Sequence, residues 1–113
     1  MKTYKFELLL DKVGEIIKIG TLLIVEGGTS RTYKWEYETG LPQDIWWANL
    51  QGLDRVRCTE SDVLFSWFQD RIPPKSRRDW QERLGMEVYD EVYIIRRTGL
   101  RLVEDTFYMR EVI

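Results

Sequence analysis

Residues 21–38 read TLLIVEGGTSRTYKWEYE, and this stretch predicts a β-hairpin. The run Thr21–Val25 is continuously apolar, which is typical of a central strand covered on both faces. Glu26–Ser30, with two adjacent glycines, is the strongest turn signal in the chain. Arg31–Glu38 then alternates, so one face of the second strand carries aromatic residues and the other carries charges. The aromatic residues are Tyr33, Trp35 and Tyr37, and the charged residues are Lys34, Glu36 and Glu38.

The residues before this hairpin extend the β pattern to the N-terminus. Tyr4, Phe6, Leu8 and Leu10 alternate with polar residues, as expected for a strand with one buried face. A turn at residues 11–14 leads to an isoleucine-rich run over residues 15–19. Gly20 follows this run and is a candidate break or bulge.

Residues 40–58 continue with weaker signals. Pro42 could begin a short helix that carries Ile45, Trp46 and Leu50 and ends at Gly52. Leu53–Cys58 alternates and predicts one more strand.

The second half of the chain changes to helical spacing. Residues 59–62 (TESD) predict the start of a helix with an apolar stripe, which Pro73 and Pro74 end. We expect a second helix from Ser76 to Gly85 and a third from near Asp90 to Gly99. Leu100–Val112 is predicted to be mostly extended. The stripe of the first helix consists of Val63, Leu64, Trp67, Phe68 and Ile72.

These elements predict an α+β fold. We expect one domain over residues 1–113, with a β-rich half over residues 1–58 and a helical half over residues 59–113. The N-terminal half would form an antiparallel meander of four or five strands, and a returning C-terminal strand would close the fold.

The composition excludes several classes of chemistry. The 113 residues contain 17 Lys and Arg, 19 Asp and Glu, a net charge of -2, no histidine and one cysteine. Without histidine there is no His-activated nucleophile and no His metal ligand, and one cysteine cannot form an internal disulfide. We therefore expect no enzyme activity, no cofactor and no metal. The acidic balance argues against nucleic acid as a partner, and the absence of a long apolar run predicts a cytoplasmic protein.

A basic segment follows the predicted first helix and is a candidate partner-binding site. Its residues are Arg71, Lys75, Arg77 and Arg78. Arginine is suited to binding carboxylates or phosphates in a bidentate manner. The competing interpretation is a solvated surface, in which Arg71 pairs with an acidic neighbour or binds the free carbonyls at the end of the helix.

The adjacent Trp46 and Trp47 form a second candidate site. Neighbouring residues on a helix or strand cannot both face one core, so one ring is expected to be exposed or covered by a partner. Tryptophan is enriched in protein-binding hot spots. The alternative is that both rings lie at the edge of the core.

The C-terminal half contains an ordered set of short motifs, which are Trp67-x3-Arg71-x2-Pro74-x2-Arg77, Leu84-Gly85, Tyr89-Asp90, Thr98-Gly99 and Asp105-x-Phe107-Tyr108. In these motifs the chain resembles small proteins of mobile elements and Gram-positive genomes, which are often encoded beside a HipA-like kinase toxin. The match covers about residues 60–110, and it departs at Tyr108, where tryptophan is common. The resemblance implies an accessory or antitoxin-like protein that binds another protein. Its signature positions would be Arg71, Pro74, Arg77, Asp90 and Asp105, with Asp105 pairing Arg71 or Arg77.

The sequence leaves three functions open. The leading prediction is a non-enzymatic protein-interaction module whose partner is a toxin or a defence effector. The alternative is a phage-encoded inhibitor that mimics nucleic acid with its carboxylates and blocks a bacterial defence nuclease. The third is a DNA-binding regulator that inserts residues 76–84 into the major groove. The acidic charge balance, the short second helix and a Pro-Pro turn in place of the usual glycine-containing turn disfavour it.

Overall fold

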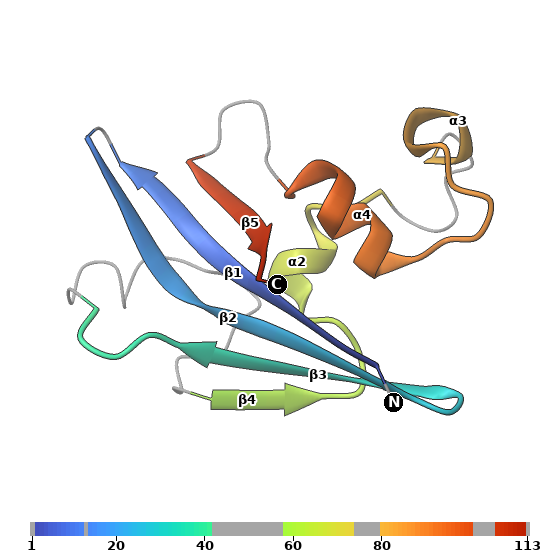
Figure 1. The fold of residues 1–113 in the computed structure, drawn as a ribbon, viewed down its shortest axis with the longest axis horizontal. Helices are drawn as coiled ribbons and strands as arrows, with labels where there is room; N and C mark the ends of the chain where they lie inside the picture. The colour runs from blue at the N-terminus through green and yellow to red at the C-terminus, as the bar shows by residue number, and fades with distance from the viewer. Residues whose placement is uncertain (1, 13, 42–57, 74–79, 101–105, 113) are drawn as a thin grey trace.

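The computed structural model describes residues 2–12, 14–41, 58–73, 80–100 and 106–112. Five strands form one antiparallel sheet in the order β4-β3-β2-β1-β5 (Figure 1). The predicted α+β fold, with an N-terminal meander and a returning C-terminal strand, is confirmed. In chain order the elements are β1 (Lys2–Lys12), β2 (Glu15–Gly27), β3 (Ser30–Tyr37), β4 (Cys58–Ser61), α2 (Ser66–Gln69), α3 (Trp80–Leu84), α4 (Glu91–Thr98) and β5 (Phe107–Glu111).

The predicted hairpin is the centre of the sheet. Gly27 pairs with Ser30, so β2 and β3 are joined by a two-residue loop in which Gly28 has a φ of 59°. Such a loop favours glycine because a positive φ is strained for residues with a Cβ. The aromatic face of β3 is buried and its charged face is exposed, as predicted.

Coverage of β2 differs from the prediction. Leu22 and Ile24 are fully buried, but Leu23 and Val25 on the opposite face stay partly exposed. The expectation that both faces of the run are covered is therefore wrong. The described helices lie on a single side of the sheet, so among the described residues the core packs against one face of this run (Figure 1).

A β-bulge interrupts the pairing of β1 with β2. Leu8 pairs with Gly20 and Leu9 with Lys18, which leaves Ile19 without a partner on β1. A Cβ built on Gly20 would lie 2.5 Å from the Glu36 carbonyl oxygen and 2.6 Å from Cζ2 of Trp35. Glycine is thus required here because the Trp35 ring lies against the backbone, and the predicted bulge is confirmed.

One hydrophobic core joins the sheet to the helices. Trp35 is fully buried and makes edge contacts with Tyr37 and Phe68, with ring centroids 5.2 and 5.6 Å apart. Such edge-to-face pairs stabilise a core beyond the burial of their area. Other members include Phe6, Leu8, Leu22, Ile24, Trp67, Val92, Ile94, Ile95 and Met109.

The predicted helix over residues 59–72 is wrong at its start. Cys58–Ser61 instead pairs with the edge of β3, and α2 spans only four residues. The Ser61 hydroxyl accepts a hydrogen bond from the Val63 amide at 3.1 Å, which forms a local turn instead of a helix cap. Val63 is 61% exposed, so the expected apolar stripe begins only at Leu64.

The third helix matches its sequence signals at both ends. The Asp90 carboxylate accepts the Val92 amide at 3.0 Å as the N-cap of α4, and Gly99 ends the helix with a φ of 63°. Leu100 also has a positive φ of 53°, so the segment after α4 begins as a turn and not as the predicted extended chain. The Met109 amide donates to the Gly99 carbonyl at 2.7 Å, which ties β5 to the end of α4.

Within the described residues, no helix is long and apolar enough to cross a membrane. The predicted helix over residues 42–52 and most of the predicted strand over residues 53–58 lie outside the described residues, as does Ser76.

Candidate functional site

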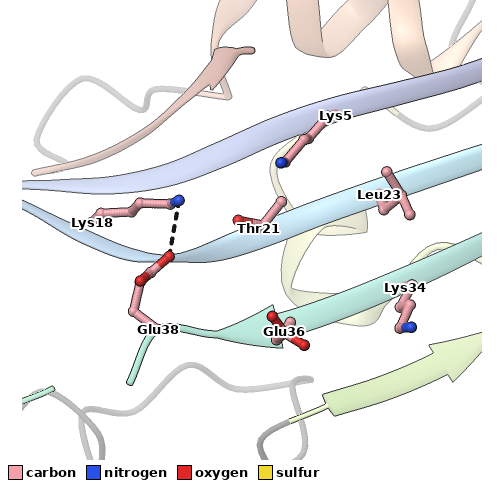
Figure 2. A pocket seen from close by; sticks show the side chains of 7 residues that line it. All are labelled: Lys5, Lys18, Thr21, Leu23, Lys34, Glu36 and Glu38. Carbon is pink, nitrogen blue, oxygen red and sulfur yellow. Dashed lines mark ion pairs between the residues drawn. The ribbon is translucent and has the colours of Figure 1, made fainter. Parts of the chain in front are cut away.

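The face of the sheet that lies opposite the helices is the candidate site. We call it the open face. A depression of about 340 Å³ lies on it over β1, β2 and β3, and Figure 2 shows the side chains around it. Its lining consists of Lys5, Lys18, Thr21, Leu23, Lys34, Glu36 and Glu38.

The strand register arranges the open face in two parallel rows. Lys5 pairs with Leu23 and Leu23 with Lys34, so one row reads Lys–Leu–Lys across the three strands. The neighbouring row is Glu7, Thr21 and Glu36, which reads Glu–Thr–Glu. Strands are about 4.8 Å apart and residues two positions apart on a strand about 6.7 Å apart, so the two rows are close neighbours.

Some charges of the open face are already paired. Lys18 Nζ lies 2.9 Å from Glu38 Oε1, and this hydrogen bond raises the pKa of Lys18 (Figure 2). Arg110 pairs with Glu7 at 3.3 Å from the neighbouring strand β5.

Three other charges at the centre of the open face remain available. In the described part of the chain, the side chains of Lys5, Lys34 and Glu36 make no ion pair or hydrogen bond. These side chains surround the half-buried Leu23. The arrangement therefore offers free charges of both signs beside an apolar centre.

A second polar cluster lies at the hairpin and joins it to α4. The Arg31 guanidinium lies 3.3 Å from both Glu26 and Asp90, and the Tyr33 hydroxyl donates to Glu91. Burial and this hydrogen bond raise the pKa of Tyr33 to about 12. The cluster fastens the hairpin to the N-terminal end of α4, so we assign it a structural role.

Arg71 lies at the corner between α2 and β5. Its guanidinium stacks over the Trp67 ring at 4.0 Å and donates to the Leu100 carbonyl oxygen at 3.3 Å. Burial lowers the pKa of Arg71. These contacts favour the structural interpretation of this residue, although the carbonyl it binds follows α4 and does not belong to the end of the first helix.

The remaining predicted site residues lie outside the described residues. These are Trp46, Trp47, Lys75, Arg77 and Arg78, together with Asp105, the predicted partner of Arg71 or Arg77. The structure thus places one member of the predicted site, Arg71.

Sequence reasoning did not single out the open face. Alternation had placed Lys34 and Glu36 on one side of β3, but their position beside Lys5 and Leu23 follows only from the pairing of three strands. Lysine is also a weaker sequence signal for a binding site than arginine or tryptophan, which are enriched in hot spots.

The chemistry available on the open face is ion pairing around an apolar centre. The described residues contain no group of three or more acidic or cysteine side chains that could hold a metal ion. No family model, curated protein or solved structure matches this chain.

Proposed function

We propose that this protein is a non-enzymatic protein-interaction module, an accessory or antitoxin-like protein that acts in the cytoplasm by binding a partner protein. The observation that carries the proposal is the open face, where Leu23 lies half-buried among free charges of both signs. Protein interfaces combine an apolar centre with a polar rim, and charges that complement the partner give them specificity.

The charge pattern favours a protein over a nucleic acid as the partner. A phosphate backbone requires a surface of one sign, whereas Glu36 and Glu38 lie beside Lys5 and Lys34 on this face. The lysines also argue against an inhibitor that mimics nucleic acid, because such an inhibitor requires a continuous acidic surface. The fitting partner is a protein surface with carboxylates opposite the lysines and a cation opposite Glu36.

Direct titration with an identified partner tests this function. A tagged chain would retrieve host proteins, and each candidate would be purified and titrated by calorimetry. We expect Lys34→Glu to weaken binding about tenfold or more, because it places like charges in contact.

The matched control is Arg97→Glu, the same change of charge at an exposed position of α4 on the helix side of the sheet. It should leave the affinity unchanged. Equal binding by wild type and Lys34→Glu would contradict the proposal that the open face is the docking surface.

A further inference from the structure

The two rows of the open face are complementary to each other. One row is Lys5–Leu23–Lys34 and the next is Glu7–Thr21–Glu36, with each lysine beside a glutamate of the same strand. We infer that the open face binds a second copy of this chain and forms a symmetric dimer. This inference rests on the proposed function, since it names the partner of the same surface.

A twofold axis explains how the rows would meet. The axis would run perpendicular to the strands, midway between the two rows and between the two stacked sheets. It would place the Lys–Leu–Lys row of each copy over the Glu–Thr–Glu row of the other. Lys34 then lies opposite Glu36 of the second copy, and the symmetry repeats this ion pair. The pair uses two charges that lack an ion pair in the described part of the chain.

The centre and the other end of the interface follow from the same operation. Leu23 would lie over Thr21 of the second copy. The two half-buried Leu23 side chains would then be diagonal neighbours on either side of the axis, at the centre of the interface. Lys5 lies over Glu7 of the second copy, which Arg110 already holds in its own chain. We therefore expect the Lys34–Glu36 contacts to contribute most to specificity.

The spacing of packed sheets permits these contacts. Two sheets stack about 10 Å apart, with strand directions within about 30° of each other. A lysine and a glutamate from opposite sheets can bridge that distance. Such a stack also covers the one face of the sheet that the helices leave open (Figure 1). Because the contacts are mainly ionic, the dimer should weaken as salt is raised.

Two opposite charge variants test this inference by complementation. Lys34→Glu places two glutamates in contact at each symmetric site, and Glu36→Lys places two lysines in contact. Sedimentation velocity over a hundredfold concentration range should show a dimer for the wild type and about tenfold or more weaker association for each variant alone. An equimolar mixture of the two variants should restore the dimer, because each mixed contact again joins a lysine to a glutamate.

The controls carry the same charge changes on exposed residues away from the open face. Arg97→Glu and Glu87→Lys should leave association unchanged, and circular dichroism would verify that every variant folds. A monomeric wild type, or a mixture that fails to associate, would overturn the inference.

The outcomes also separate this inference from the proposed function. A monomeric chain that binds another purified protein in a Lys34-dependent manner would overturn the dimer but support the proposed function. A monomeric chain without any such partner would contradict both.

Discussion

The two faces of one sheet differ sharply although they come from the same strands. On the helix-covered face, Phe6, Leu22 and Trp35 are completely buried. On the open face, their neighbours Lys5, Leu23 and Lys34 remain exposed or half-exposed. At these positions, one set of alternate side chains stabilises the fold, and the other set stays accessible to a partner. Substitutions on the two faces should therefore affect different measurements.

Trp35→Ala should cause the largest loss of stability. The ring is fully buried and contacts Tyr37 and Phe68, so its removal should lower the free energy of unfolding by about 3–5 kcal/mol. Chemical denaturation would measure the loss. Trp35→Phe is the control, because it keeps an aromatic ring and removes a buried indole N–H that has no hydrogen-bond partner in the described structure. A loss below 1 kcal/mol for Trp35→Ala would contradict the assigned core.

Gly20→Ala should also be costly, although it adds only one methyl group. That group would lie 2.5 Å from the Glu36 carbonyl oxygen and against the Trp35 ring, so the bulge must shift. We expect a loss of about 2–3 kcal/mol in the free energy of unfolding. Thr21→Ala, at the next position on the open face, should change stability by less than about 0.5 kcal/mol. Equal losses in the free energy of unfolding for the two variants would contradict the assignment of Gly20 to the packed face and of Thr21 to the open face.

Tyr33→Phe should change the dependence of stability on pH. At pH 8 the variant should be less stable by about 1–2 kcal/mol, because it lacks the hydrogen bond to Glu91. The pKa of Tyr33 is about 12 in the folded protein, whereas its ordinary value, which we assign to the unfolded chain, is 10.0. The unfolded chain therefore releases the phenol proton first as pH rises. The contribution of Tyr33 to the stability of the wild type therefore falls as pH rises from 10 to 12, and the variant, which lacks the hydroxyl, shows no such loss.

Denaturation at pH 8, 10 and 11 would follow the difference between the two proteins. We expect the gap to narrow at alkaline pH. A constant gap from pH 8 to pH 11 would show that the Tyr33 hydroxyl is not held in the neutral form.

Lys18→Gln should have the smallest effect. Its ion pair with Glu38 lies on the open face, with both side chains more than a third exposed. Solvent screens such pairs, so we expect a change below about 0.5 kcal/mol in thermal or chemical denaturation, and none in high salt. A loss comparable to that of Trp35→Ala would mean that the open face is part of the core.

Local signals were sufficient to predict parts of the fold. The two glycines before Thr29 identify the hairpin loop, and Asp90 and Gly99 mark the ends of α4, because caps and tight turns depend on the residues within them. The start of the first helix could not be predicted in this way. Residues 59–61 are of types that favour the start of a helix. They pair instead with the edge of β3, which offers backbone hydrogen-bond partners, and this pairing becomes evident only in the folded structure.

The candidate site was only partly visible in the sequence. Alternation indicated that Lys34 and Glu36 share a face, but the rows they form with Lys5, Leu23 and Thr21 depend on register across three strands. The contacts of Arg71 with Trp67 and Leu100 favour the structural alternative for this residue, and its predicted role in partner binding stays a prediction. The resemblance to mobile-element proteins stays a prediction.

Amide NMR spectra of the labelled chain, recorded over a range of protein concentrations, test the central claim most directly. If the open face binds a second copy, the concentration-dependent shifts should gather at β2 and β3 around Leu23 and Lys34, and Lys34→Glu should move them to about tenfold or more higher protein concentration. Spectra that do not change with concentration, or shifts that gather on α4 instead, would contradict the account.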